Sequence, residues 1–304
     1  MKNIKIVNEF EASAVSLGCM RMGGLDEKRV DAIMDTAIEN GINFFDHADI
    51  YGKGNAEKVF GEYLKRHGGQ REKIMIQTKC AIHDGQYDFS KEHILKSVDG
   101  SLSRLGTEYI DVLLLHRPDI LMEPEEVARA FDHLKSSGKV RHFVVSNQNR
   151  YQVELLQSCL DMPLCANQLQ FSIMHTSMVS SGINVNLYND SATVRDGGIL
   201  DYCRLKGITI QAWSPMQNGF FEGCFIDNDK FPEVNRAMDE VAEKYGISKT
   251  TLAIAWILRH PARMQPITGT TNPGRLRDCL KATEVTLSRE DWYKIYTAAG
   301  NELP

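Results

Sequence analysis

The feature that most constrains the fold is a regular alternation of strand-like and helix-like segments along the 304 residues. Eight short segments are predicted as strands, at residues 14–19, 42–45, 74–79, 109–116, 140–145, 164–170, 208–213 and 265–268. The segment 109–116 is almost continuously apolar, as in a strand that is buried on both faces. Such alternation predicts a parallel sheet, and eight units suit a closed (β/α)8 barrel.

Helix signals fall between nearly all of these segments. Asp26 and Ser90 can cap helices whose apolar residues recur at helical spacing, and Pro124 suits the first turn of another. Further helices are predicted at 56–66, 150–159, 199–206, 232–245, 248–260, 273–282 and 288–299. The residues before the first strand are predicted to form a small hairpin over a barrel mouth.

A doubly wound sheet is the structural alternative to a barrel. Its usual Gly-x-Gly-x-x-Gly turn after the first strand is missing, and the nearest match, Gly52-Lys-Gly-Asn-Ala-Glu57, lacks the third glycine. No linker or low-complexity tract divides the chain. We therefore predict one α/β domain over residues 1–304, a (β/α)8 TIM barrel with an N-terminal hairpin.

Two intervals, 172–198 and 216–231, are longer than the loops of a barrel usually are. Both follow predicted strands, so both belong to the C-terminal face of the barrel. Long loops on that face are either functional lids or flexible insertions, and the sequence leaves both readings open.

Composition excludes several classes of partner. The formal net charge is −5 with the charges well mixed, which argues against a nucleic acid or an anionic membrane. No apolar run approaches the roughly 18–20 residues of a membrane span, and residues 1–7 lack the features of a signal peptide. Seven scattered cysteines without a Cys-x-x-Cys pair indicate reduced thiols. These features predict a cytoplasmic protein.

Four ionisable side chains fall at matching places along the chain. Asp46 ends the second predicted strand, Lys79 the third and His116 the fourth, while Tyr51 lies five residues after Asp46. Taken singly, each has an ordinary structural reading, such as a turn cap or a surface lysine. In a barrel, however, the C-terminal strand ends meet at one mouth, where catalytic groups of this fold lie.

This set suits proton donation to a carbonyl oxygen. An ammonium beside a phenol favours the phenolate and lowers its pKa, Asp46 can hold Lys79, and His116 can polarise the carbonyl. No nucleophile is paired with a histidine, no metal motif is present, and the spacing of Asp46, His47 and Asp49 matches no usual metal site. A proton donor without a nucleophile or a metal implies a cofactor that supplies a hydride.

At these residues the chain resembles the aldo-keto reductase family over essentially its whole length. The matching motifs are Asn43-Phe-Phe-Asp-His-Ala-Asp-Ile-Tyr-Gly52, Gln77-Thr-Lys79, Asp111-Val-Leu-Leu-Leu-His-Arg-Pro118, Ser146-Asn147, Ala166-Asn-Gln168, Trp213-Ser-Pro215 and Pro266-Ile-Thr-Gly-Thr-Thr-Asn-Pro-Gly-Arg275. The segments 288–296 and 301–304 are similar to a bacterial branch typified by YdhF-like oxidoreductases.

The resemblance implies reduction of an aldehyde or ketone to an alcohol, with Asp46, Tyr51, Lys79 and His116 as the catalytic tetrad and Tyr51 as the acid. It also implies an extended nicotinamide dinucleotide across the barrel mouth. Ser146, Asn147 and Gln168 would hold its carboxamide, Trp213 would stack on the nicotinamide, and Met20, Arg21 and Met22 would lie near the nicotinamide ribose. Ser214, Pro215 and Met216 would follow the pyrophosphate, and Gly269, Thr270, Thr271, Asn272 and Arg275 would surround the adenosine 2′-phosphate.

Departures from the family pattern bear on the nucleotide. Gly269 stands where many members have a lysine, and Asp278-Cys279 stands where they have Glu-Asn. NADP(H) preference therefore depends mainly on Arg275, with NAD(H) as the alternative. Trp213 could also pack at the barrel rim, and Ser146-Asn147 could cap the helix at Arg150.

Two other functions stay open at this stage. One is an NADPH-sensing regulatory subunit with little turnover, and the other is a metal-dependent barrel hydrolase. The carbonyl substrate and the oligomeric state do not follow from the sequence.

Overall fold

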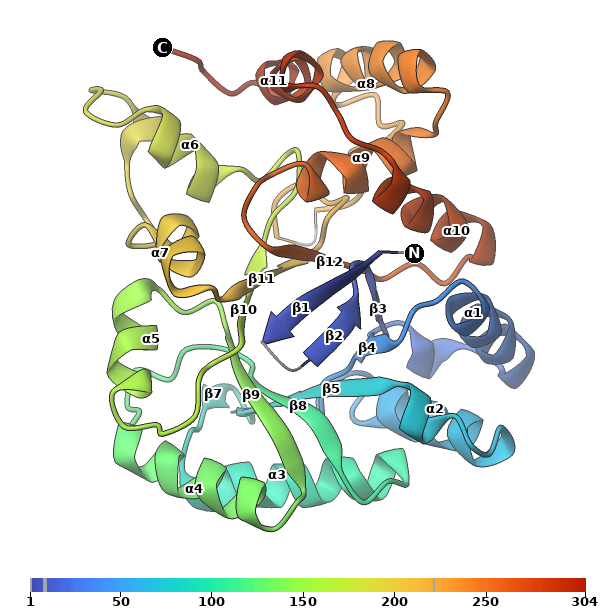
Figure 1. Cartoon of the computed structure of the whole chain (residues 1–304), viewed down its shortest axis with the longest axis vertical. Helices are drawn as coiled ribbons and strands as arrows, with labels where there is room; N and C mark the ends of the chain where they lie inside the picture. Colours follow the sequence, from blue (N-terminus) through green and yellow to red (C-terminus); the bar gives the residue numbers. More distant parts are fainter. Residues whose placement is uncertain (1, 8–9, 221) are drawn as a thin grey trace.

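The computed structural model describes residues 2–7, 10–220 and 222–304, and its centre is a closed barrel of eight parallel strands (Figure 1). Around the barrel the strand order is β10-β11-β12-β3-β4-β5-β8-β9. Their bounds are β3 Ser16–Gly18, β4 Phe44–Asp46, β5 Met75–Cys80, β8 Ile110–Leu115, β9 Val140–Ser146, β10 Ala166–Gln170, β11 Thr209–Trp213 and β12 Met264–Thr268. The predicted (β/α)8 barrel is confirmed, and each predicted strand overlaps an observed one.

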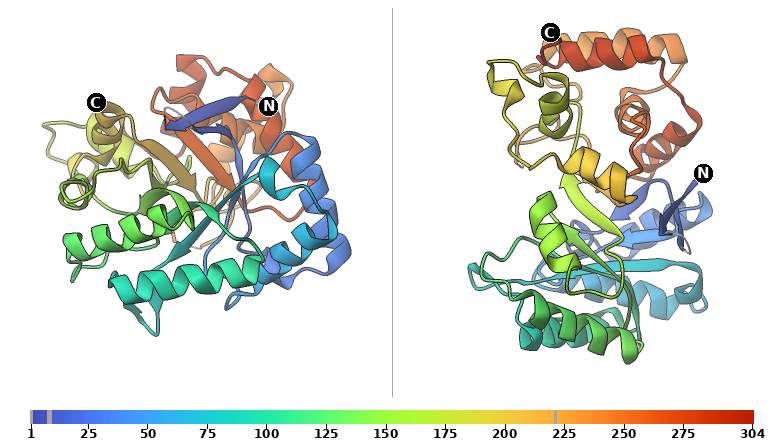
Figure 2. Two further views of the ribbon diagram at one scale, coloured as in Figure 1. Left: turned by 60° about the horizontal axis from the view of Figure 1, so that its bottom comes forward. Right: turned by 60° about the vertical axis from the view of Figure 1, so that its left-hand side comes forward.

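The helices surround this barrel on the outside (Figure 2). Within the described residues they are α1 Glu27–Glu39, α2 Asn55–Arg66, α3 Lys91–Leu105, α4 Pro124–Ser136, α5 Arg150–Gln157, α6 Ser177–Ile183, α7 Ile199–Lys206, α8 Pro232–Tyr245, α9 Lys249–Leu258, α10 Pro273–Lys281 and α11 Arg289–Ala298. The predicted caps are present: the Asp26 carboxylate accepts a hydrogen bond from the Arg29 amide, and the Ser90 hydroxyl accepts one from His93.

The N-terminal hairpin closes the barrel end opposite the strand termini that carry the ionisable residues. Its strands are β1 Asn3–Val7 and β2 Phe10–Ser13, which pair antiparallel. Ile6 and Ala12 pack in one cluster with Phe44 and Ala166, which begin β4 and β10. Because the hairpin fills the bottom of the barrel, the other mouth is the one left for ligands.

Several short elements were not predicted. After β5 the chain forms a second hairpin, β6 Ile82–His83 and β7 Gln86–Tyr87, whose turn places Asp84 and Gly85 at positive φ. The interval 172–198 contains α6 and a short 3-10 turn, Asp190–Ala192, rather than unstructured loop alone.

Side chains near the end of the chain hold the interval 172–198 in place. The Thr176 hydroxyl donates to Asn301 Oδ1 at 2.7 Å, and the Asn189 amide donates to Glu302 Oε2 at 2.8 Å. The Tyr296 hydroxyl donates to Ser180 Oγ at 2.9 Å. These bonds fasten the interval to α11 and the residues after it.

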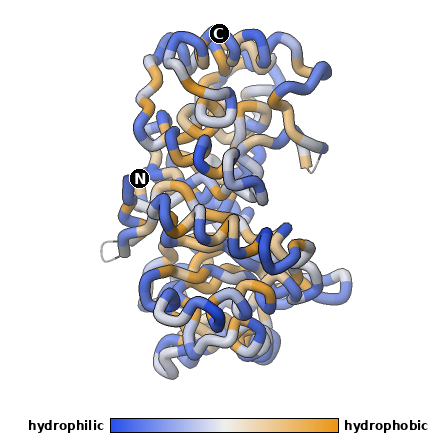
Figure 3. Tube along the Cα trace, turned by 90° about the vertical axis from the view of Figure 1, so that its right-hand side faces the viewer, coloured by the Kyte–Doolittle hydropathy of each residue, from blue (hydrophilic) through white to orange (hydrophobic). Residues whose placement is uncertain are grey.

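Hydrophobic packing continues between the barrel and the helices. Figure 3 shows hydrophobic stretches of the trace running through the interior of the molecule. At the C-terminal side, the Trp256 and Trp292 rings stack with centroids 4.6 Å apart, and each indole N–H donates to the other residue's carbonyl oxygen at 3.0 Å. This reciprocal pair locks α9 against α11. No helix of the described ranges is both long and apolar enough to cross a membrane.

Helices α2 and α3 approach so closely that α2 has room only for a glycine at one position. A Cβ on Gly61 would lie 2.6 Å from the Arg104 carbonyl oxygen and 2.7 Å from that of Leu105. Beside this contact, the Arg104 guanidinium donates to the fully buried Glu57 carboxylate at 2.7 Å. The close approach thus positions a buried ion pair.

We expect Gly61→Ala to destabilise the protein by about 1–3 kcal/mol, because overpacking against backbone outweighs the helix propensity that alanine gains. The matched control is Gly182→Ala in α6, where an added Cβ meets nothing within 4 Å. That control should leave stability unchanged or raise it slightly. Urea unfolding midpoints measure both, and a Gly61→Ala protein as stable as the control would contradict the close approach.

Candidate active site

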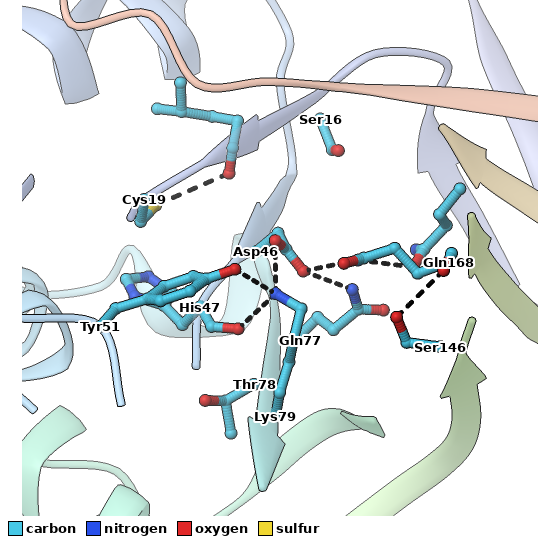
Figure 4. Close-up of polar contacts among 12 residues, drawn as sticks. Ser16, Cys19, Asp46, His47, Tyr51, Gln77, Thr78, Lys79, Ser146 and Gln168 are labelled. Carbon is cyan, nitrogen blue, oxygen red and sulfur yellow. Dashed lines mark hydrogen bonds and ion pairs between the residues drawn. The ribbon is translucent and has the colours of Figure 1, made fainter. Parts of the chain in front are cut away.

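The strand ends bring the four predicted ionisable residues to one mouth of the barrel. Asp46 is the last residue of β4, Lys79 lies near the end of the neighbouring β5, and His116 directly follows β8. Tyr51 lies on the turn between β4 and α2. Figure 4 shows the Tyr51 hydroxyl and the Asp46 carboxylate pointing toward the amine of Lys79.

The buried amine of Lys79 is at the centre of this group. Its side chain is fully buried, and Nζ donates to Asp46 Oδ2 at 2.7 Å, to the His47 carbonyl oxygen at 2.8 Å and to Tyr51 Oη at 3.1 Å. An ammonium has three donors, so every one of them is used. Burial lowers the pKa of Lys79, but Asp46 and Tyr51 outweigh burial and hold it above its ordinary value. Lys79 is therefore charged at neutral pH.

The pKa of Tyr51 differs from the expectation. Burial raises the pKa of this phenol, and although Lys79 acts in the opposite direction, the net shift is upward. The predicted lowering of the Tyr51 pKa by the ammonium is present, but removal of the phenolate from water outweighs it. Tyr51 is thus a protonated phenol at neutral pH, which can donate a proton.

His116 completes the mouth of the site. Its ring lies edge-on to the Tyr51 ring, with centroids 5.9 Å apart. Burial, with smaller contributions from Lys79 and Arg117, holds the pKa of His116 well below its ordinary value. The imidazole is neutral at physiological pH and offers one N–H donor.

Two glutamines support Asp46 from the side away from Lys79. The Gln77 amide donates to Asp46 Oδ1 at 2.6 Å, and the Gln168 amide donates to the same oxygen at 3.0 Å. Both glutamines are buried. The carboxylate therefore accepts hydrogen bonds on both oxygens.

The support continues as a chain of buried amides through the barrel interior. Gln168 donates to Gln211 Oε1 at 3.3 Å, Gln211 to Gln265 Oε1 at 3.0 Å, and Gln265 to the Ser13 carbonyl oxygen at 2.9 Å. We call these residues with Asp46 the glutamine chain. It connects the site to the N-terminal hairpin.

A second polar group lies beside the tetrad on β9, β10 and β11. Asn147 Nδ2 donates to Ser146 Oγ at 2.6 Å, Ser146 Oγ donates to the Gln168 carbonyl oxygen at 3.0 Å, and Trp213 Nε1 donates to Asn147 Oδ1 at 3.2 Å. Asn147 has a φ of 54° and Ser214 one of 52°, in the left-handed region. The predicted helix cap is not at Ser146-Asn147, since Asn149 caps α5.

A cleft of about 630 Å³ runs from the tetrad toward α10. Asp46, Tyr51 and His116 line it, whereas Lys79 lies beneath. The predicted cofactor-binding residues that line it are Met20, Arg21, Ser146, Asn147, Gln168, Trp213, Ser214, Pro215, Met216, Gly269, Thr270 and Arg275. Three others do not: Met22 is buried in the core, Asn272 caps α10 through the Arg275 amide, and Thr271 lies outside the lining.

The two long intervals differ in their contribution to this cleft. Met216, Gln217, Phe220 and Cys224 from 216–231 line it, whereas no residue of 172–198 does. The interval 172–198 is instead tied to the C-terminal residues by its hydrogen bonds.

The model of the aldo/keto reductase family matches residues 14–299. The chain belongs to the aldo-keto reductase family. It is 35% identical to a 6-dehydroglucose reductase of Agrobacterium fabrum, with 100% of both chains covered, and 33% identical to the oxidoreductase YdhF of Escherichia coli, with 92% of this chain and 91% of that one covered. The expected likeness to YdhF-type oxidoreductases is confirmed.

The fold of this aldo-keto reductase is also similar to a solved structure. A thermostable aldo-keto reductase, Tm1743, crystallised with the inhibitor epalrestat, superposes with a TM-score of 0.77 at 26% identity, covering 98% of this chain and 100% of the other. The family and its relatives identify the protein as an oxidoreductase.

Sequence reasoning missed some residues around the site. Gln77 precedes Lys79 by two positions on β5, and because side chains alternate along a strand, this spacing could have placed it on the same inward face. Arg117, Ile82, Tyr87 and Thr250 also line the cleft. Ile82 and Tyr87 lie on the unpredicted β6–β7 hairpin, for which the sequence carried only the Asp84-Gly85 turn as a signal.

The residues considered for a metal do not converge. The His47 ring is fully buried against Phe60, with centroids 4.5 Å apart, and neither ring nitrogen has a hydrogen-bond partner among the described residues. Burial lowers the pKa of His47 to about 3, so the ring is neutral. Asp46, His47 and Asp49 do not form a group of described side chains whose ligand atoms all lie within 4.8 Å of one another, so they do not surround one ion.

A different trio, His83, Asp88 and His93, has ligand atoms within 4.8 Å of one another. Its two imidazoles are stacked 4.4 Å apart with planes only 20° apart. Because the lone pairs of parallel rings do not point at a common centre, we assign no metal to this trio.

We expect Lys79→Met to lower the free energy of unfolding by about 3–5 kcal/mol, because it leaves the Asp46 carboxylate buried without its counter-ion. The double variant Asp46→Asn/Lys79→Met should cost less than the sum of the two single variants. Chemical denaturation of the four proteins measures this coupling.

An exposed pair of the same residue types provides the control. Lys139 Nζ lies 2.6 Å from Asp99 Oδ1, with both side chains more than a third exposed. Lys139→Met should cost less than about 1 kcal/mol. If the losses of unfolding free energy in the Asp46 and Lys79 single variants add up to the loss in the double variant, the buried pair is not coupled.

Proposed function

We propose that this aldo-keto reductase reduces an aldehyde or ketone to an alcohol with NAD(P)H, and that Tyr51 is the proton donor. The observation that carries the proposal is the contact between the buried Lys79 ammonium and the protonated Tyr51 hydroxyl on the cleft wall. When bound, the nucleotide would supply a hydride to the carbonyl carbon. The Tyr51 O–H bond breaks as its proton passes to the carbonyl oxygen, and the resulting phenolate is stabilised by Lys79.

The other two residues have supporting roles in this mechanism. The neutral His116 donates its N–H to the carbonyl oxygen and orients it toward Tyr51. Asp46 holds Lys79 through the 2.7 Å ion pair and keeps its charge in place while the phenolate forms. Because the pKa of Tyr51 is raised, the phenol carries near neutral pH the proton that reduction requires.

The residues of the cleft fit a nicotinamide dinucleotide. Ser146, Asn147 and Gln168 present a hydroxyl and amide groups beside the tetrad, which suits a carboxamide. Arg275 lies in the first turn of α10, where the helix N-terminus and the guanidinium both favour an anion. An arginine at the far end of the cleft supports NADP(H) over NAD(H).

The relatives suggest a substrate class without fixing it. One of them is named as a reductase of 6-dehydroglucose, a sugar aldehyde. We infer that the substrate is a small carbonyl compound and that residues 1–304 act as one catalytic domain in the cytoplasm.

We expect Tyr51→Phe to lower kcat for aldehyde reduction by about 10²–10⁴-fold, because the proton donor is lost. NADPH affinity and the unfolding midpoint should change little, since Lys79 keeps its bonds to Asp46 and His47. Steady-state kinetics and NADPH fluorescence titration measure these quantities.

Tyr188→Phe is the control for this variant, because its side chain is fully exposed in the interval 172–198. It should match the parent protein. Full activity of Tyr51→Phe would remove Tyr51 as the acid, whereas tight NADPH binding without turnover of any aldehyde by the parent protein would favour the sensing role instead.

We expect Arg275→Leu to lower kcat/KM for NADPH by about 10–100-fold and to leave kcat/KM for NADH nearly unchanged, because only NADPH carries the 2′-phosphate. The exposed Arg277→Leu, two residues further along α10, serves as the matched control. An equal fall in kcat/KM for NADPH and for NADH would place Arg275 outside the site of the 2′-phosphate.

A further inference from the structure

Arg117 lies beside the tetrad and has no part in the mechanism above. It follows His116 directly after β8, and its side chain lines the cleft. The guanidinium carbon lies 5.6 Å from the centroid of the Trp213 ring and 5.5 Å from that of Phe220. These aromatic rings give it weak cation–π contacts that hold it over the cleft.

Arg117 has no acidic partner within ion-pair distance among the described residues, unlike the partly buried Arg71 and Arg104. Arg71 donates to Asp111 at 2.8 Å, and Arg104 donates to Glu57 at 2.7 Å. A partly buried cation without a counter-ion is costly to maintain. The guanidinium has a planar fork of N–H donors that matches oxygen acceptors, so a ligand oxygen is its natural complement.

The charge around the catalytic end of the cleft supports this reading. The ammonium of Lys79 is neutralised by Asp46 at 2.7 Å, and His116 is neutral. Arg117 therefore contributes a positive charge there that the tetrad does not compensate. The lining of the cleft also includes Ile50 and Ile82, whose side chains carry no acceptor.

We propose that Arg117 is a substrate-binding residue that holds an oxygen-rich group of the carbonyl substrate, either a carboxylate or a set of hydroxyls. This selects hydrophilic aldehydes over apolar ones of similar length, and it rests on the proposed carbonyl reduction. A substrate with an apolar tail would cover the guanidinium without pairing it, which costs binding energy. An oxygen-bearing tail replaces the water that the guanidinium loses.

The test compares the parent protein with Arg117→Met, which keeps an unbranched side chain but removes the charge. The substrates are succinic semialdehyde, with a carboxylate, glyceraldehyde, with hydroxyls, and the apolar aldehydes butanal and propanal of matching carbon number. We expect Arg117→Met to lower kcat/KM by about 10–100-fold for at least one oxygen-bearing aldehyde. The kcat/KM of this variant for butanal and propanal and its KM for NADPH should stay within about twofold of those of the parent protein. Arg129→Met, on an exposed position of α4, is the matched control and should behave as the parent protein.

The pattern of losses identifies the group that is held. A loss for succinic semialdehyde alone assigns a carboxylate, and a loss for glyceraldehyde as well assigns oxygen acceptors in general. Equal losses for all four aldehydes, no loss for any, or a raised KM for NADPH would overturn the proposal.

A binding measurement separates this proposal from the proposed function. Calorimetric titration of 4-hydroxybutyrate, glycerol and 1-butanol into the NADP⁺-saturated protein needs no turnover. If the parent protein reduces none of the aldehydes, the proposed reduction fails. Weaker binding of 4-hydroxybutyrate or glycerol to Arg117→Met, with 1-butanol unaffected, would still support the role of Arg117, and unchanged binding of all three would refute it.

Discussion

The rest of the site depends on the three hydrogen bonds that the buried ammonium of Lys79 donates. A fully buried cation is tolerable only when its donors are all satisfied, and here the three acceptors come from the end of β4 and the turn after it. The hydrogen bonds to Lys79 therefore fix the direction in which the chain leaves the barrel after β4. The Tyr51 hydroxyl is brought to the cleft as one of these acceptors, so the same contacts that neutralise the charge also position the phenol.

The carboxylate that balances this charge is held from the opposite side by the glutamine chain. Neutral amides can donate to Asp46 without adding a second charge to the barrel interior. Gln168 also donates to the amide oxygen of Gln211, which donates in turn to that of Gln265. The chain ends on the hairpin at Ser13, so the polar residues of the interior form one connected network. Such a network is rigid only while every member is paired.

Much of this arrangement could be predicted from the sequence. Strand ends are readable from hydrophobic patterns, and barrel geometry then places Asp46, Lys79 and His116 together, so three widely separated residues could be grouped. Cleft positions such as Arg275 and Ser214 came from motif resemblance. The roles of these residues stay proposals, because no ligand contact tests them.

What could not be predicted depends on burial and on local turns. The pKa of Tyr51 follows from how far the phenol is removed from water, which strand spacing does not give. The β6–β7 hairpin and α6 are short elements in polar sequence, where hydrophobic periodicity is weak. Arg117 could be read only as a neighbour of His116, since its lack of an acidic partner is a property of the folded cleft.

The seam between β3 and β12 has a consequence for how the molecule is assembled. Ile267 pairs with Ser16 and Thr268 with Leu17, so strands about 250 residues apart complete the ring. Until they meet, each is an open edge with free N–H and C=O groups that can recruit a strand from another molecule. Loop-closure entropy makes such a distant pairing slow. A chain that has not yet closed its barrel therefore carries two strand edges that are open to aggregation.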